Sequence, residues 1–328
     1  MKAHLDPHPR RSRQTTIWFC ALVGLGCNLV GLAQRPAQGP ISAVRQTPEA
    51  LGYELVWEDD FNGNALDPQK WAVRGVGPRA LGYVSPEAVT VGDGYLKLHA
   101  LKKNDRILLG AVGTQDRFMT RYGYFECRAQ LQKSPGIWAA FWIQSTEIAK
   151  GEDPAIYGAE IDIMEFFKKL GTDIVSHNVH WAYGPRQQTT RGMQSYLKGV
   201  GEGFHTFALE WTPEKYAFFV DGYRFYEVRA GLSHIEEYMI LSMEIPSKPE
   251  EIKDTVFPDV FVVDYVKVYK KKRGLSAGLP ADAPAQTTRP AIYDDAAEGD
   301  KQVEEALVPI NGPGVVRRPT SRSDGSPA

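Results

Sequence analysis

The sequence has little cysteine, almost no net charge and only one long hydrophobic run. Its 328 residues include three cysteines, and two of them lie inside that run, so Cys127 has no partner for an intrachain disulfide in the rest of the chain. Lys and Arg number 38 against 40 Asp and Glu, a balance that excludes the strongly basic surface of a nucleic-acid-binding protein. A single hydrophobic run excludes a membrane protein with several spans. The folded part must therefore be held by a hydrophobic core, and we expect Cys127 to be buried in it.

Nucleotide-binding and zinc-protease motifs are also missing. The chain contains no P-loop, no dinucleotide-binding glycine pattern and no HExxH motif. The spacing of His177 and His180 puts them on opposite faces of a predicted strand, which is a poor arrangement for a pair of zinc ligands. We therefore predict that the protein requires no cofactor.

The hydrophobic run covers residues 17–33 and follows a segment with one lysine and three arginines. This order predicts a signal peptide over residues 1–33, cleaved after Ala33. The run is short for a membrane span and contains three glycines and an asparagine, which favours a removed signal over an uncleaved anchor or a lipoprotein attached at Cys27. We expect a secreted or periplasmic protein without stable membrane association after cleavage.

Composition divides the remaining chain into three parts. Residues 34–50 are rich in Pro, Gln and Ala and are predicted to be a linker. Residues 272–328 lack hydrophobic periodicity and are predicted to be a disordered tail. Residues 51–271 remain as one globular unit of about 220 residues, the size of a single β-sandwich. Nothing in the sequence indicates oligomerisation, so we expect a monomer.

Short alternating segments separated by turn signals predict an all-β fold. Asp93-Gly94 and Asp221-Gly222 each separate two alternating segments and predict two-residue hairpins, because both positions of such a turn need positive φ angles. Residues 233–236 fit a capping box and predict one short helix. The pattern as a whole indicates two packed antiparallel sheets.

Three carboxylates gather in the segment GAEIDIMEFF. In a regular strand Glu160 and Asp162 share a face and Glu165 points away, whereas a β-bulge between Asp162 and Glu165 returns all three to one face. The outer two carboxyl groups would then come within roughly 5–6 Å, the separation found in a retaining glycosidase. A solvated acidic strand or a calcium site is the alternative, but the strand is too apolar to lie on an open surface.

This segment resembles the bulged Glu-x-Asp-x-x-Glu signature of glycoside hydrolase family 16, whose members are retaining endo-acting enzymes. Further blocks resemble the family in the same order, namely LVWEDDFNGNALDPQKW, RYGYFECRAQL, GIWAAFWIQS, FHTFALEWTPEKYAFFVDG and VFVVDYVKVY. The resemblance implies a concanavalin A-like β-jelly-roll sandwich of two antiparallel sheets. It also implies that Glu160 is the nucleophile, Asp162 the assisting aspartate and Glu165 the acid/base.

Aromatic and polar residues near these acids are candidates for binding sugar. Trp138 is similar to the family's tryptophan platform, and by resemblance His180 faces the cleft. Sugar rings stack on aromatic faces and hydrogen-bond through their edges, so the complete set of candidates also includes residues of the neighbouring predicted strands and of an early loop. The predicted substrate-binding residues are Trp138, His180, Trp142, Trp181, Glu244, Arg79 and Tyr83.

The resemblance also raises a structural calcium on the convex side of the sandwich. Many relatives hold such an ion with groups near the first strand and an aspartate of the last, and Asp264 is the matching residue here. An aspartate on the surface of an alternating strand needs no ion, so the calcium is an expectation of the resemblance alone.

The sequence thus predicts an exported retaining endo-β-glycosidase that hydrolyses internal linkages of a polysaccharide by double displacement. β-1,3-Glucan and marine galactans such as agar, porphyran or carrageenan are both compatible substrates. A transglycosylase on the same scaffold and a non-catalytic carbohydrate-binding protein are the alternative functions. A binding protein has no need of all three acids, which argues against the latter.

Overall fold

The computed structural model describes residues 37–190 and 192–272. They belong to the compact unit that begins at Ala33. The predicted signal peptide and the predicted tail beyond Lys272 lie outside the described residues. In the part of the chain that is described, no helix is long and apolar enough to cross a membrane.

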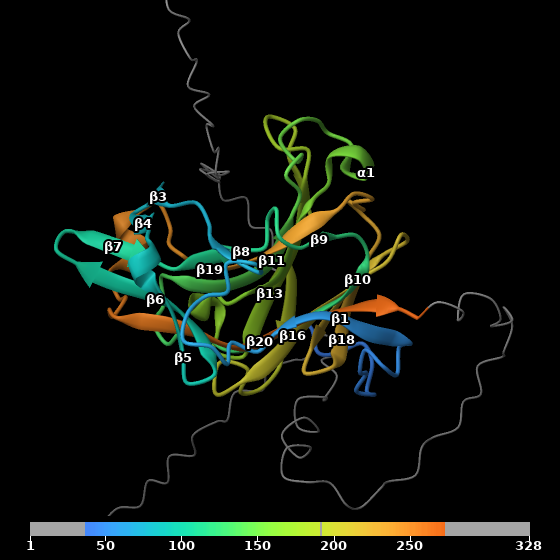
Figure 1. Ribbon diagram of the computed structural model, residues 1–328, viewed down its shortest axis with the longest axis horizontal. Coiled ribbons are helices and arrows are strands. Elements are labelled where there is room, and N and C mark those ends of the chain that lie inside the picture. The colour runs from blue at the N-terminus through green and yellow to red at the C-terminus, as the bar shows by residue number, and fades with distance from the viewer. Residues whose placement is uncertain (1–36, 191, 273–328) are drawn as a thin grey trace, which may run out of the picture. The chain divides into compact units, whose positions relative to one another are not determined.

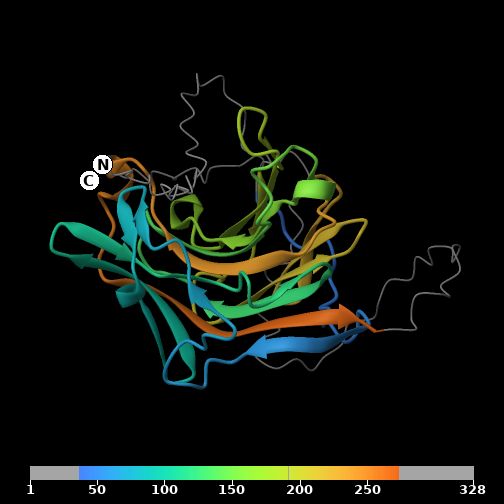
Figure 2. The same cartoon turned by 45° about the horizontal axis from the view of Figure 1, so that its top comes forward.

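Two β-sheets account for nearly half of the described residues, and they pack as layers (Figure 2). The first has eleven strands within the described ranges, with the main order β18-β17-β16-β10-β20-β6-β7-β4-β3 and with β1 and β5 paired to β20 and β6. Its strands are β1 (Tyr53–Asp59), β3 (Gly77–Arg79), β4 (Gly82–Val84), β5 (Val89–Gly92), β6 (Tyr95–Lys103), β7 (Arg106–Leu109), β10 (Gly123–Gln130), β16 (His205–Trp211), β17 (Tyr216–Val220), β18 (Tyr223–Val228) and β20 (Asp259–Lys271).

The second sheet has nine strands in the described chain, with the main order β14-β13-β12-β11-β19-β8-β2 and with β15 and β9 paired to β13 and β19. Its strands are β2 (Ala72–Val73), β8 (Ala111–Gly113), β9 (Met119–Thr120), β11 (Trp138–Gln144), β12 (Glu160–Glu165), β13 (Ile174–Trp181), β14 (Gln188–Thr189), β15 (Met193–Tyr196) and β19 (Glu237–Glu244). All pairings but that of β4 with β7 are antiparallel, which confirms the predicted all-β sandwich of two antiparallel sheets.

Helices are few and short. One α-helix, α1 (Pro154–Tyr157), and three 3₁₀ turns, η1 (Pro86–Ala88), η2 (Lys168–Leu170) and η3 (Pro249–Ile252), occur in the described ranges. The helix predicted over residues 233–236 is absent, and that prediction is wrong. The buried Ser233 instead places its backbone N–H on the hydroxyl of Tyr216, so tertiary contacts hold this segment in an irregular conformation.

Both predicted hairpins are confirmed. Asp93 and Gly94 have φ angles of 58° and 78° and join β5 to β6, while Asp221 and Gly222, with φ angles of 50° and 78°, join β17 to β18. An Asp-Gly pair accepts this left-handed backbone because a short polar side chain and a glycine pay little steric cost there.

The core lies between the two sheets and is formed by alternate side chains of the long strands. Cys127 on β10 is fully buried there, and burial raises the pKa of its thiol well above the ordinary value. The expectation of a buried cysteine is confirmed, since a thiol kept neutral in an apolar core packs as a small hydrophobic group.

Residues 38–46, within the predicted linker, run along the edge of the sandwich. The backbone N–H of Gln38 donates to Gln194, that of Ile41 to Arg224 and that of Gln46 to Gly222. The side chain of Gln38 also donates to the carbonyl of Phe225 at 2.7 Å. The bonds to Arg224 and Phe225 satisfy carbonyl groups of the edge strand β18, and the bond to Gln194 satisfies one of β15.

Candidate active site

The acidic segment forms β12, and its bulge is present where the sequence predicts it. Against β11, Asp162 pairs with Trp142 and Met164 with Phe141, so Ile163 is the extra residue. The register with β13 shifts between Asp162 and Glu165 as well. As a result Ile163 and Met164 both point into the core, and Glu165 shares the other face with the two earlier acids. We call this the active-site face of the nine-stranded sheet.

A glycine and a buried acid fix the start of β12. Gly158 has a φ of 79° and lies so close to Ser145 that a Cβ atom on it would be 2.2 Å from the Cβ of Ser145. The N–H of Ala159 donates to Oε1 of Glu237 at 2.8 Å. Burial raises the pKa of Glu237 to about 8. The backbone leading into Glu160 is therefore held from the core side.

Glu160 is anchored by two neutral donors. Its Oε2 accepts from Nε2 of Gln144 at 2.6 Å and from the hydroxyl of Tyr183. Burial and the charge of Asp162 raise the pKa of Glu160 to about 7, whereas His180, the Tyr183 hydroxyl and Arg74 act in the opposite direction. One oxygen is thus held in place and the carboxyl titrates above its ordinary range.

Asp162 lies between the two glutamates and contacts His180 of β13. Nε2 of His180 is 3.1 Å from Oδ2 of Asp162. Burial disfavours the charged imidazole, but the hydrogen bond to Asp162 and the charges of Asp162, Glu160 and Glu165 outweigh it and raise the pKa of His180 to about 9. At neutral pH the histidine is therefore a cation among three acids, and it faces the site as the resemblance implies.

Glu165 is held by an indole and an amide. Nε1 of Trp138 donates to its Oε1 at 3.0 Å, and Nδ2 of Asn178 donates to its Oε2 at 3.1 Å. Burial, followed by the charge of Asp162, raises the pKa of Glu165 well above the ordinary value. The pKa of both glutamates is thus raised, and the two carboxyls differ in the donors that hold them.

These groups also form the only set of three or more His, Cys, Asp or Glu side chains in the described residues that is compact enough to hold a metal ion. Atoms of Glu160, Asp162 and His180 lie within 4.8 Å of one another. In this structure Nε2 of His180 is engaged with Oδ2 of Asp162 at 3.1 Å. The arrangement is that of an ion pair beside a carboxylate.

The two predicted tryptophans of β11 differ in their exposure. Trp138 is half-buried and packs at 5.0 Å against the ring of Phe167. Trp142 is buried because the guanidinium of Arg74 lies 4.8 Å above its ring, and its Nε1 donates to Ser242 at 3.1 Å. Trp138 therefore offers surface to a ligand, and the ring of Trp142 supports Arg74.

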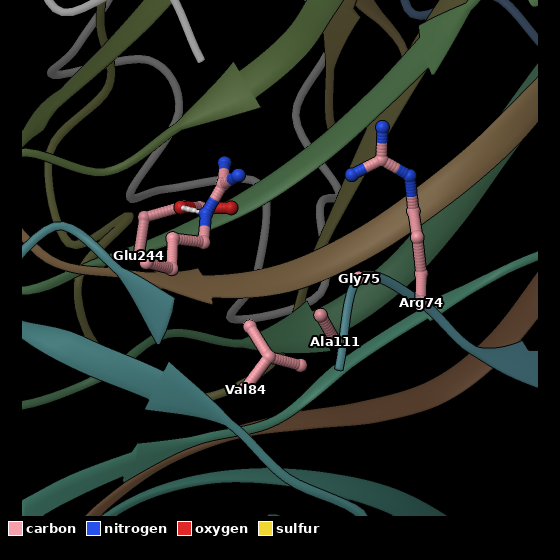
Figure 3. A pocket seen from close by; sticks show the side chains of 6 residues that line it. Arg74, Gly75, Val84, Ala111 and Glu244 are labelled. Carbon is pink, nitrogen blue, oxygen red and sulfur yellow. Dashed lines mark hydrogen bonds and ion pairs between the residues drawn. The ribbon is translucent and has the colours of Figure 1, made fainter. Parts of the chain in front are cut away.

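Arg79 and Glu244 form an ion pair beside the acids, at one side of a pocket (Figure 3). The pocket is lined by Arg74, Gly75, Arg79, Val84, Ala111 and Glu244. Tyr83 does not join them. It alternates with Val84 and pairs with Pro78, so it points to the other face of β4, and Arg106 lies 5.3 Å above its ring. Tyr83, one of the predicted substrate-binding residues, therefore lies on the opposite face of β4 from the pocket residue Val84.

Trp181, predicted to bind substrate, does not lie on the active-site face. It shares a face of β13 with His177 and Val179, both of which are fully buried in the core, and it packs against that core. A Cβ atom on Gly231 would lie 2.5 Å from its ring. Trp181 therefore faces away from His180 and the acids, because alternate residues of a strand point to opposite sides.

Asp264, the predicted calcium ligand, takes part in an ion pair. Its carboxylate is bound by Arg128, whose guanidinium also lies 4.9 Å above the ring of Phe204. Among residues 37–190 and 192–272, Asp264 belongs to no group of three or more His, Cys, Asp or Glu side chains that could hold a metal ion. The calcium stays a prediction of the resemblance.

Sequence reasoning did not find four of the groups that surround the acids. They come from the two strands beside β12, from the loop after β13 and from the residue after β2, and they are Gln144, Asn178, Tyr183 and Arg74. Gln144 and Asn178 lie on the same strand faces as Trp142 and His180, and this alternation was a usable signal. Tyr183 and Arg74 carried none, because they lie outside the regular part of those strands.

Comparison with known proteins decides the family. A family model for glycosyl hydrolases family 16 matches residues 84–259. The chain belongs to glycoside hydrolase family 16. The family resemblance is thereby confirmed, and this glycoside hydrolase is 32% identical over 282 residues to a beta-glucanase of Rhodothermus marinus, a match that covers 77% of this chain and 93% of the relative.

Solved structures of family 16 share the fold. The laminarinase of Flavobacterium sp. UMI-01 has a TM-score of 0.56 and 27% identity, with 66% of this chain and all of that chain (100%) covered. SCLam, a non-specific endo-beta-1,3(4)-glucanase, has a TM-score of 0.57 and 27% identity, with 72% of this chain and 96% of that chain covered.

Proposed function

We propose that this family 16 enzyme hydrolyses internal linkages of a β-1,3-glucan with retention of anomeric configuration. The observation that carries the proposal is the bulge of β12, which brings Glu160, Asp162 and Glu165 to one face and gives each a different partner. The choice of glucan is supported by the similarity to proteins named beta-glucanase, laminarinase and endo-beta-1,3(4)-glucanase.

In the first step Glu160 attacks the anomeric carbon and forms a covalent glycosyl-enzyme. The glycosidic bond breaks as Glu165 gives its proton to the departing oxygen. The division follows the family resemblance, and Glu165 has its own donors in Trp138 and Asn178. The Tyr183 hydroxyl and the Gln144 amide hold the attacking carboxylate in one orientation.

In the second step Glu165, now ionised, takes a proton from water, and the resulting oxygen attacks the same carbon and releases Glu160. Asp162 and His180 remain an ion pair beside the reacting groups. The positive imidazolium lowers the pKa of both glutamates and so offsets the repulsion among three neighbouring carboxylates.

New reducing ends, measured on a panel of polysaccharides, test the substrate. The panel contains laminarin, mixed-linkage β-glucan, agar, porphyran and carrageenan. We expect laminarin to be cut fastest, with oligosaccharide products of several lengths. Faster cleavage of a galactan contradicts the glucan assignment, and binding without product contradicts catalysis.

Proton NMR of the first product tests the mechanism. Retention predicts that the β-anomer appears before mutarotation, whereas an α-product overturns double displacement. The Glu160→Ala variant should lose at least about 1,000-fold in kcat without unfolding. If sugar acceptors at high concentration yield longer oligosaccharides in place of hydrolysis, the enzyme is a transglycosylase with the same covalent intermediate.

We also propose that the enzyme is exported. The basic segment followed by the hydrophobic run at residues 17–33 supports this. N-terminal sequencing of the protein from the culture medium or periplasm should begin at Gln34. A protein that retains Met1 and stays in the membrane fraction contradicts cleavage.

A further inference from the structure

The bulge that gathers the three acids leaves one peptide group outside the ordinary strand pairing. Ile163 has no partner residue on β11, and on the other side Ile163 and Met164 lie opposite the single residue His177 of β13. A buried carbonyl that has lost its place in the ladder needs another donor. The side chain of His177 supplies one.

His177 is fully buried on the core side of β13 and uses both of its ring nitrogens. Nδ1 lies 2.6 Å from the carbonyl oxygen of Ile163, and Nε2 lies 2.7 Å from Oγ of Ser195 on β15. A carbonyl oxygen can only accept, so Nδ1 carries the proton and Nε2 accepts from the Ser195 hydroxyl. Burial lowers the pKa of His177 to about 4, which agrees with a neutral ring of this tautomer.

Packing holds the ring in this orientation. The ring of Phe218 lies at 5.1 Å and that of Tyr226 at 5.9 Å from the imidazole. Tyr226 is itself fixed by its hydroxyl, which accepts from the N–H of Gln194 and donates to the carbonyl of Gln194, both at 3.0 Å. His177 is therefore a rigid donor aimed at the bulge from the face opposite to the active site.

We propose that His177 is a positioning residue for the acid/base Glu165. Its Nδ1–H donates to the carbonyl of Ile163, the extra residue of the bulge. This bond fixes the position of the bulge, and the bulge turns Glu165 toward Glu160 and Asp162. Without the bond, loss of the bulge would shift the strand by one residue and turn Glu165 to the core side. The inference rests on the role proposed above for Glu165.

Two substitutions at His177 separate its two bonds. The amide nitrogen of asparagine takes nearly the position of Nδ1, and that of glutamine nearly the position of Nε2. We expect His177→Asn to keep kcat/KM on laminarin within about threefold of the wild type, and His177→Gln to lower it by at least about tenfold. The Ser195→Ala variant removes only the other bond of the ring and should behave like His177→Asn.

An activated substrate distinguishes positioning of Glu165 from general damage to the fold. In a 2,4-dinitrophenyl β-glucoside the leaving group is dinitrophenolate, which departs without taking up a proton. The kcat/KM for this substrate therefore does not depend on the general acid. His177→Gln should therefore lose laminarin activity and keep dinitrophenyl glucoside activity within about threefold of His177→Asn. An equal loss on both substrates, or no loss on laminarin, overturns the proposal.

Two further measurements cover the remaining outcomes. Nitrogen-15 NMR of the wild-type enzyme should show His177 as the Nδ1–H tautomer, and an Nε2–H tautomer overturns the proposal even if His177→Gln does not fold. Glu165→Ala should keep kcat/KM on the dinitrophenyl glucoside, and added azide should raise its kcat on this substrate. If it does neither, the role of Glu165 fails, which is a result distinct from failure at His177.

Discussion

Nε2 of His180 lies 3.1 Å from Oδ2 of Asp162, and this contact places the imidazole of His180 beside Asp162 and Glu160. The charge of His180 lowers the pKa of both Glu160 and Glu165 relative to what burial alone would give. Asp162 acts in the opposite direction on both. The balance between these two residues therefore sets the pH range in which one glutamate is ionised and the other protonated.

Replacement of His180 by glutamine should move the acidic limb of the pH profile upward. Glu160 must be ionised to attack, so activity is lost as pH falls through its pKa, which lies at about 7 in the wild type. Loss of the imidazolium raises that pKa further, and the limb of kcat/KM against pH moves to higher pH. His205→Gln is the matched control, because His205 is also paired with an aspartate, Asp221, at 2.6 Å on the other sheet. A limb that stays in place in His180→Gln contradicts the charge argument.

Replacement of Tyr183 by phenylalanine should weaken the nucleophile. The Tyr183 hydroxyl binds Oε2 of Glu160 and lowers its pKa. A hydrogen bond to a charged group contributes about 1.5–3 kcal/mol, so kcat/KM should fall by roughly 10- to 100-fold near neutral pH. Tyr95→Phe on the eleven-stranded sheet should leave the rate unchanged. Equal rates for wild type and Tyr183→Phe on laminarin would remove Tyr183 from the site.

The ion pair between Arg79 and Glu244 predicts an effect on binding alone. Both residues line the pocket, and Glu244 lies opposite Trp138 on the neighbouring strand. Alanine at either position should raise KM about 5- to 10-fold with little change in kcat, and the double variant should cost no more than the larger single one. Tyr83→Ala, on the opposite face of its strand, should leave KM unchanged. Additive losses would show that the two residues act separately.

Asp59 predicts a loss of stability outside the site. It is buried at the end of β1, where Oδ2 accepts from Nε1 of Trp71 at 2.9 Å and Oδ1 from the N–H of Phe61 at 3.1 Å. Asp59→Ala leaves two buried donors without an acceptor and should lower the free energy of unfolding by about 3 kcal/mol, or Tm by roughly 10 °C. The exposed neighbour Asp60, which binds only Asn62 through its side chain in the described residues, is the control, and Asp60→Ala should change stability by less than about 0.5 kcal/mol. Equal melting curves for the two variants would contradict this role of Asp59.

The sequence by itself determined the fold class, the two Asp-Gly hairpins and the bulge of β12. These features are local, since each follows from the alternation of a few adjacent residues. The pattern of Ile161, Ile163 and Met164 against Glu160, Asp162 and Glu165 changes phase once, and only a bulge accommodates that change. The alternation of side chains along β13 also places Trp181 and His180 on opposite faces. The prediction that both bind the sugar did not take this alternation into account.

Only the tertiary structure decided which groups meet the acids. Tyr183 reaches Glu160, and Arg74 reaches the ring of Trp142, from irregular segments outside the strands that carry the acids and the tryptophan. Which residues lie opposite each other depends on strand order and register, and a single sequence shows neither. The helix expected over residues 233–236 failed for the same reason, because the contact between Ser233 and Tyr216 outweighs the local capping signal. Periodicity within one strand sets the face of a side chain, and the packing of separate strands sets its neighbours and therefore its pKa and its role.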